Sequence, residues 1–211
     1  MRLNQFVGGD AEEPAQRISA KDLAEFLTGR VSAFRGRDDW QGTFIDNHDQ
    51  LRTLVRLQKL GVPLEESKRR LDLAAVLLMT VRGIPIILYG DEQYLANYND
   101  NHNTPPKYIN SDDDDPFNRV GMTSFDESAR AFQIIKTLAN LRKESPAIQR
   151  GSYIPIYADQ DALVFLRVSE SDVVLVAVNR GTDKEVVLPA NNHLREGKYV
   201  DLLDVPGPGL C

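Results

Sequence analysis

The sequence predicts an α/β segment followed by an all-β segment, and three observations lead to this expectation. Up to residue 89, helical and strand patterns alternate in the order helix, strand, helix, strand. The second strand, Ile84–Tyr89, is a nearly continuous apolar run between two glycines, which is typical of a strand buried on both faces. From about Ser145 onward, short β-branched and aromatic runs recur at roughly even spacing, separated by Asp, Gly and Asn turns.

The first predicted helix spans Ser19–Phe34. Ser19 and Asp22 have the spacing of a capping box, in which each side chain accepts a backbone N–H of the other residue. Apolar residues then recur every three or four positions, which predicts one buried face. The following run, Gly42–Asp46, is β-branched and aromatic and ends in polar residues. A parallel strand ends in this way when it delivers side chains to a site.

Pro63 opens a second predicted helix, which ends before the strand Ile84–Tyr89. Residues 91–127 then form a long loop rich in Asn, Asp and Pro. A loop of this length inside a compact domain indicates a functional segment, and a third helix, Ser128–Lys143, follows it. These elements define a first predicted unit, residues 1–144, with connections long enough for right-handed crossovers.

The second predicted unit, residues 145–211, has all-β character. Five short strands are expected there: Tyr153–Tyr157, Ala162–Val168, Val173–Val178, Glu185–Leu188 and Lys198–Leu203. Strands of this length, separated by turn residues, predict the beginning of an antiparallel β-sandwich. We expect the sandwich to be partial, because only these five strands precede the terminal PGPGLC segment.

The composition excludes several classes of protein. Hydrophobic residues make up 42% and charged residues 27% of the chain, the balance of an ordinary globular protein. A net charge of −6 argues against nucleic acid as a partner, because a phosphate backbone requires a basic face. No apolar run approaches the roughly 20 residues of a membrane span, and no secretory signal is visible. Cys211 is the only cysteine, so no intrachain disulfide is expected and the cellular compartment stays open.

The stretch TFIDNHDQLR (Thr43–Arg52) is the most informative part of the sequence. It places Asp46, His48 and Asp49 directly after a predicted strand, so two carboxylates and an imidazole lie at the strand's carboxyl end. In a parallel α/β barrel, this face carries the chemistry. The same residues also fit a polar turn that caps the following segment, and spacing alone does not separate the two interpretations.

Several collinear motifs together resemble the α-amylase family of glycoside hydrolases. TFIDNHD, followed three residues on by Arg52, resembles the family's fourth conserved region at the end of barrel strand seven. GIPIILYGDEQYL (Gly83–Leu95) resembles the strand-eight segment, and DPFNR (Asp115–Arg119) resembles the loop after it. RAFQIIKTLANLRKESPAI (Arg130–Ile148) resembles the last barrel helix. The resemblance covers about residues 40–203 and is nearest to cyclodextrin glucanotransferases and the α-amylases close to them.

The resemblance implies a fold and a set of site residues. The chain would contain strands seven and eight of a (β/α)8 barrel, followed by a partial antiparallel β-sandwich. Asp49 matches the carboxylate that stabilises the transition state of glycoside cleavage, and His48 matches the histidine that hydrogen-bonds the same sugar. Asp115 and Arg119 match a pair that contacts a glucose on the non-reducing side of the cut. These two residues also fit a plain surface ion pair.

No cofactor is implied by the resemblance. The acidic run Asp112–Asp115 suits a calcium ion, since carboxylates are the ligands that hard cations prefer, but it equally fits a solvated loop tip. Asp91 and Glu92, after the second strand, match positions that the family uses structurally. The expected ligand is an α-glucan or maltooligosaccharide, and neither nucleic acid nor a membrane is expected as a partner.

The motifs of the family's nucleophile and general acid/base have no match in this sequence. The chain therefore fits a portion of an α-glucan hydrolase or transglycosylase that lacks its two chemical groups. It also fits a non-catalytic carbohydrate-binding or assembly module. A third possibility is an oligomeric amylase whose site is rebuilt between chains from carboxylates such as Asp46, Asp49 and Glu92. Because two parallel strands leave sheet edges open, we expect a homo-oligomer or a partner that supplies the rest of the barrel.

Overall fold

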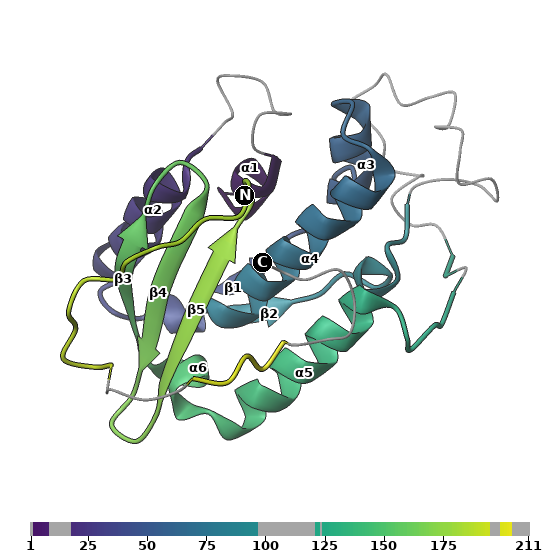
Figure 1. Cartoon of the computed structure of the whole chain (residues 1–211). Coiled ribbons are helices and arrows are strands. Elements are labelled where there is room, and N and C mark those ends of the chain that lie inside the picture. The colour runs from purple at the N-terminus through teal and green to yellow at the C-terminus, as the bar shows by residue number, and fades with distance from the viewer. Residues whose placement is uncertain (1, 9–17, 97–120, 123, 195–198, 204–211) are drawn as a thin grey trace.

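Two separate sheets and a set of helices make up the computed structural model, which describes residues 2–8, 18–96, 121–122, 124–194 and 199–203 (Figure 1). The helices are α1 (Arg2–Gly8), α2 (Ala20–Ala33), α3 (Thr53–Lys59), α4 (Leu64–Thr80), α5 (Arg130–Glu144) and α6 (Pro146–Arg150), with short 3₁₀ turns η2 (Asp38–Trp40) and η3 (Asp91–Gln93). The strands are β1 (Gly42–Phe44), β2 (Ile84–Ile86), β3 (Ser152–Ala158), β4 (Ala162–Val168) and β5 (Val173–Asn179). No helix in these described ranges is long and apolar enough to cross a membrane.

Strands β1 and β2 form a parallel pair, with Gly42 opposite Ile84 and Phe44 opposite Ile86. Parallel pairing with helices between the strands confirms the α/β prediction, although both strands are shorter than expected. The prediction that Ile84–Tyr89 is buried on both faces is wrong for this structure, because Ile84 is 54% and Ile86 is 51% exposed. Within the described residues the sheet has two strands only, and the side chains of Ile84 and Ile86 remain half exposed.

Helices α2 and α4 form where the sequence predicts them. The Ser19 hydroxyl accepts the backbone N–H of Asp22 at 3.0 Å, and the Asp22 carboxylate accepts the backbone N–H of Ser19 at 2.7 Å, which completes the predicted capping box. Helix α4 follows Pro63 and is buried at every position from Leu71 to Thr80. A helix that is buried around its whole circumference lies at the centre of a core rather than on its surface.

The second sheet is antiparallel, with strand order β3-β4-β5 and β4 buried in the middle. These strands confirm three of the five predicted ones. Glu185–Leu188 is not a strand, and neither is the described part of the fifth, residues 199–203, so both predictions are wrong. A short run becomes a strand only by pairing with a neighbour. Within the described chain this sheet ends at β5, and Val187 beyond it is 92% exposed.

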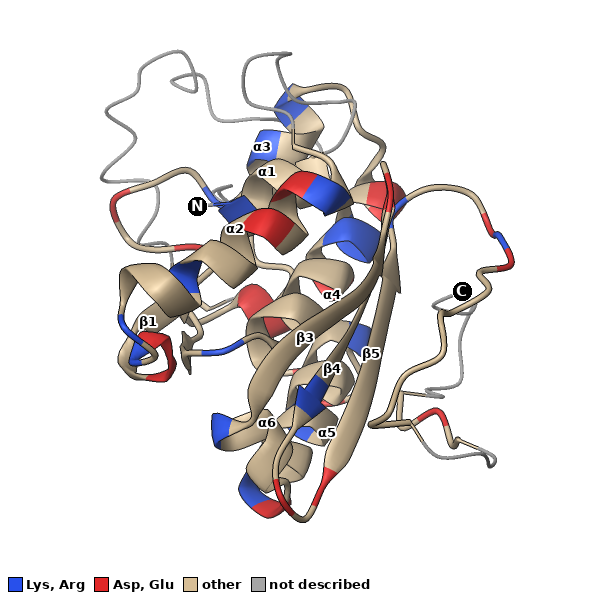
Figure 2. Ribbon diagram, turned by 90° about the vertical axis from the view of Figure 1, so that its left-hand side faces the viewer, with Lys and Arg blue, Asp and Glu red and all other residues tan. Residues whose placement is uncertain are grey.

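Helices, instead of a second sheet, cover the inner face of the three-stranded sheet. Helix α2 packs against β3 and β4, and helix α4 packs against β5 and α5 (Figure 1). One hydrophobic core runs through this contact and includes Leu23 of α2, Leu77 of α4 and Phe165 of β4. Charged residues gather on the helices and turns, while the strands of this sheet are largely uncharged (Figure 2). The partial β-sandwich expected from the sequence is therefore a single sheet backed by helices in the described residues.

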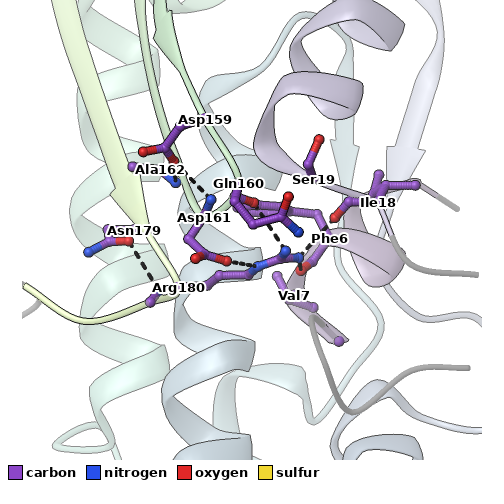
Figure 3. A network of polar contacts seen from close by, with 12 residues as sticks. Phe6, Val7, Ile18, Ser19, Asp159, Gln160, Asp161, Ala162, Asn179 and Arg180 are labelled. Carbon is purple, nitrogen blue, oxygen red and sulfur yellow. Dashed lines mark hydrogen bonds and ion pairs between the residues drawn. The ribbon is translucent and has the colours of Figure 1, made fainter. Parts of the chain in front are cut away.

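A buried arginine ties the amino-terminal helices to this sheet (Figure 3). The Arg180 guanidinium pairs with the Asp161 carboxylate at 2.9 Å and donates to the backbone carbonyls of Ile18 and Phe6. It also donates to the carbonyl of Gln160 at 3.1 Å and lies 4.7 Å from the centre of the Phe6 ring. One side chain, directly after β5, thus joins α1, the residue before the cap of α2 and the β3–β4 turn.

Candidate functional site

The loop that follows β1 carries the candidate site residues, and its base is closed by hydrogen bonds. The buried Asp46 carboxylate accepts the backbone N–H of Thr53 at 2.9 Å and the Thr53 hydroxyl at 2.6 Å. Thr53 is the first residue of α3, so the bonds join the end of a strand to the start of a helix. The segment between them is held as a compact turn.

His48 and Asp49 lie at the tip of this loop and face solvent. The His48 Nε2 atom lies 3.0 Å from the Asp49 Oδ1 atom, and the two side chains are 60% and 67% exposed. The Asn47 side-chain oxygen accepts the backbone N–H of Asp49 at 2.9 Å, which shapes the turn beneath the pair. An exposed imidazole and carboxylate held side by side can together donate to and accept from the hydroxyl groups of a sugar.

Arg52 connects the loop to the segment after β2. Its guanidinium pairs with the Asp91 carboxylate at 3.1 Å and donates to the Tyr89 carbonyl oxygen at 2.9 Å. It also lies 5.1 Å from the centre of the Tyr89 ring. The Arg52 side chain is fully buried, and such a cation requires partners of this kind because isolated burial of a charge is costly.

Two buried carboxylates, Asp46 and Asp91, lie near this one arginine, and the pKa of each is raised. Burial raises the pKa of Asp91 to about 8, and the nearby Asp46 carboxylate adds to the increase. Burial likewise raises the pKa of Asp46, against the opposing effect of its hydrogen bonds from Thr53. One guanidinium balances only one negative charge, so the charged form of a second carboxylate is disfavoured and the pKa of both groups lies above its ordinary value.

The structure separates the residues that the sequence placed together. His48 and Asp49 share the exposed tip, whereas Asp46 is buried and bonded to Thr53. Glu92 accepts the backbone N–H of Gly90 at 2.9 Å, a contact that stabilises the turn after β2. Sequence reasoning missed the pairing of Arg52 with Asp91, although both residues lie in motifs that follow strands. The signal was available in the parallel order of those strands, whose carboxyl ends meet at one edge.

Asp115 and Arg119 lie outside the described residues, as does the acidic run Asp112–Asp115. Among the residues that are described, no group of His, Cys, Asp and Glu is arranged to hold a metal ion. An apolar hollow of about 430 Å³ lies between α4, β5 and residues 183–188 and 201–203, and its lining does not include His48 or Asp49. It lies on the helix-covered face of the sheet, beside β5, and shares no lining residue with the candidate site.

Comparison with known proteins gives consistent matches. Residues 5–130 match the model of the alpha amylase catalytic domain. The chain is 40% identical over 196 residues to a cyclomaltodextrin glucanotransferase of Klebsiella oxytoca, covering 87% of this chain and 29% of the relative. It is 34% identical over 182 residues to an alpha-amylase of Niallia circulans, covering 86% of this chain and 30% of the relative.

Among solved structures, the chain is similar to CldA, described as the first cyclomaltodextrin glucanotransferase with a three-domain ABC distribution. The TM-score is 0.75 at 34% sequence identity, covering 95% of this chain and 35% of that structure. The chain therefore spans roughly a third of this structure and less than a third of the curated relatives.

Proposed function

Because the chain belongs to the α-amylase family of glycoside hydrolases, we propose that it supplies part of the active site of an enzyme that hydrolyses or transfers α-glucan chains. In this proposal, residues 1–144 contribute the last βα units of a (β/α)8 barrel and residues 145–211 contribute part of a carboxy-terminal β-domain. Further polypeptide provides the rest of the barrel, including the nucleophile and the general acid/base.

The observation that carries this proposal is the exposed pair of His48 and Asp49 after the carboxyl end of β1. Glycoside cleavage in this class proceeds through an oxocarbenium-like state, and a fixed carboxylate stabilises that state through the sugar hydroxyls and the developing positive charge. Asp49 has the exposure and the neighbouring imidazole that this task requires. We assign it the role of transition-state stabiliser, and His48 the role of hydrogen-bonding partner to the same sugar.

The substrate class follows from the relatives. Their names refer to cyclomaltodextrin, glucan transfer and amylase activity, so an α-glucan or maltooligosaccharide is the proposed ligand. Asp115 and Arg119 are proposed to bind a second glucose, since a carboxylate and a fork-shaped guanidinium both suit sugar hydroxyls. Hydrolysis and transfer both fit, because the choice of acceptor depends on parts of a cleft that this chain does not carry.

We expect the isolated chain to bind maltoheptaose weakly, with a dissociation constant on the order of millimolar, because part of a cleft makes few contacts while immobilising the sugar costs as much as before. Amide chemical shifts followed by NMR during a titration would measure it. Asp49→Asn should weaken binding several-fold. Glu170→Gln, which changes an exposed carboxylate in the β4–β5 turn, serves as the matched control and should leave binding unchanged. Equal losses in both variants would remove Asp49 from the proposed site.

Self-association is a second proposal, and the open face of β2 favours it. Ile84 and Ile86 are half exposed on a strand whose sheet has no further strand within the described chain. Edges of this kind pair with other chains. We expect light scattering at high protein concentration to give a mass well above the 23.7 kDa of one chain. Replacing both isoleucines by Thr should shift the mass toward the monomer, whereas a monodisperse monomer in the unmodified protein would refute the proposal.

A further inference from the structure

We propose that Arg52 is a positioning residue, which holds the loop carrying His48 and Asp49 in place by tying it to the turn after β2. The inference rests on the proposed function only for the statement that this loop binds sugar. The mechanical claim concerns the free protein and can be tested without any ligand.

The two ends of the loop are fixed in different ways. At its base, the Asp46 carboxylate accepts both the N–H and the hydroxyl of Thr53, so the strand end and the helix start cannot separate. Both bonded residues lie at the base of the loop, so these bonds by themselves fix the base and not the direction of the tip. A second attachment to another element is needed to set the direction of the tip.

Arg52 provides that second attachment. It lies directly before Thr53 and reaches across to two groups of the β2 segment, the Asp91 carboxylate at 3.1 Å and the Tyr89 carbonyl at 2.9 Å. A planar guanidinium with two fixed acceptors restricts orientation as well as distance, which a lysine ammonium does not do. The guanidinium also lies over the Tyr89 ring, 5.1 Å from its centre, so it contacts the acceptor segment on a third side.

The receiving turn is itself rigidly built. Gly90 adopts a left-handed conformation with φ of 88°, and a β-carbon at this position would lie 2.5 Å from the Leu95 side chain. Glu92 accepts the Gly90 N–H at 2.9 Å and closes the turn. A fixed acceptor makes Arg52 a constraint on the loop, because the partner does not follow the loop when it moves.

The competing explanation is that the Arg52–Asp91 pair only stabilises the fold. A second buried arginine, Arg180, offers a control that distinguishes this explanation from a positioning role. Arg180 is also buried, pairs with a carboxylate at 2.9 Å and donates to backbone carbonyls, but it joins the end of β5 to α1, the segment before α2 and the β3–β4 turn (Figure 3). Arg180→Met removes a network of similar chemistry from a different part of the fold. It is therefore the matched control for Arg52→Met.

The test is the backbone amide order parameter of Asn47, His48 and Asp49, measured by NMR relaxation in the absence of sugar. In the unmodified chain we expect values near the rigid limit of about 0.85, and in Arg52→Met values below about 0.6. Arg180→Met should lower the melting temperature and leave these three amides unchanged. Unchanged order at the tip in a folded Arg52→Met protein would overturn the proposal, and so would equal loss of order in both variants.

Asp91→Ala gives a second variant in case Arg52→Met does not fold. The alanine removes one of the two acceptors of the Arg52 guanidinium and leaves the Tyr89 carbonyl in place, so the tip should become more mobile by a smaller amount. Order at the tip that is insensitive to this change refutes a role for the Arg52–Asp91 pair. If order falls as expected while maltoheptaose still fails to bind the unmodified chain, the positioning role stands and the proposed sugar site fails.

Discussion

We expect the chain alone to cleave a nitrophenyl maltoside no faster than buffer does. It should become active when a second polypeptide supplies the remaining part of the catalytic domain. A glycosidic oxygen leaves only when an acid of raised pKa protonates it, and the retaining mechanism requires two carboxyl groups about 5–5.5 Å apart across the bond. Asp49 provides neither a proton donor nor a covalent route by itself. Asp46 is buried and bonded to Thr53, so it does not complete a pair with Asp49.

The experiment combines the purified chain with the part of the Klebsiella oxytoca relative that it does not match. In the reconstituted enzyme, Asp49→Asn should lower the rate by about 10²–10³-fold, a loss on the scale of removing one preorganised electrostatic contact to a transition state. Glu170→Gln is the control and should have the rate of the unmodified chain. Both variants should assemble equally well, as judged by co-elution.

Two results would contradict this expectation. Turnover by the chain alone that disappears in Asp49→Asn would mean that identical chains build a complete site between them. Full activity of the reconstituted Asp49→Asn enzyme would show that Asp49 is not the stabilising carboxylate. Turnover by the chain alone that survives Asp49→Asn would indicate a contaminating amylase, which a second purification would remove.

The folded chain should be most stable at mildly acidic pH, with its free energy of unfolding falling by a few kcal/mol between pH 5 and pH 9. Burial raises the pKa of Asp91 to about 8 and that of Asp72 to about 6. Asp72 is buried between α4 and α5, where it accepts the Tyr94 hydroxyl at 2.7 Å and lies 3.4 Å from Arg130, with Lys68 also near. These partners oppose the effect of burial without cancelling it.

The fall in stability with rising pH follows from the number of protons that each state binds. In the unfolded chain both carboxyl groups titrate near 3.8, whereas in the folded chain they keep their protons to higher pH. Unfolding between these values therefore releases protons, and the stability of the folded state falls as pH rises through about 6 and then about 8. Each full unit of pH within the window changes the free energy by about 1.4 kcal/mol per group.

Thermal unfolding followed by circular dichroism across this range would measure the effect. Asp72→Asn and Asp91→Asn should each flatten the profile and raise stability at pH 9 relative to the unmodified chain. Asp22→Asn is the control, because hydrogen bonds from the Ser19 N–H and hydroxyl lower the pKa of Asp22, so this group is ionised in both states throughout the window. Stability that rises from pH 5 to pH 9 would contradict the prediction.

Local patterns predicted the elements well because the forces that form them are local. The capping box at Ser19 depends on residues three apart, and the bounds of β4 follow from one apolar run between turn residues. The exposure of Ile84 was predicted poorly, because burial of a strand depends on neighbours far away in the chain. The prediction of a strand at Glu185–Leu188 was wrong for the same reason: the run has an apolar pattern, but no described strand pairs with it.

The candidate site was predictable only in part. The resemblance singled out Asp49, but no pattern in the sequence distinguishes it from Asp46, a carboxylate three positions earlier. Their environments diverge because Asp46 meets Thr53, whereas Asp49 projects beyond the loop base. The raised pKa of Asp91 depends on a contact with residues about forty positions earlier, so it emerges only once the two strands are placed side by side.

The half-exposed isoleucines of β2 have a colloidal consequence. At pH 7 the chain carries a net charge of −6, and this common charge keeps molecules apart even when apolar faces are open. Near the isoelectric point of about 5.1 that repulsion vanishes, while Ile84 and Ile86 remain uncovered. The pH at which single molecules resist unfolding best is thus close to the pH at which their solution is least stable against precipitation. Lowering the pH from neutral toward 5 therefore raises the free energy of unfolding of each molecule and at the same time weakens the repulsion between molecules.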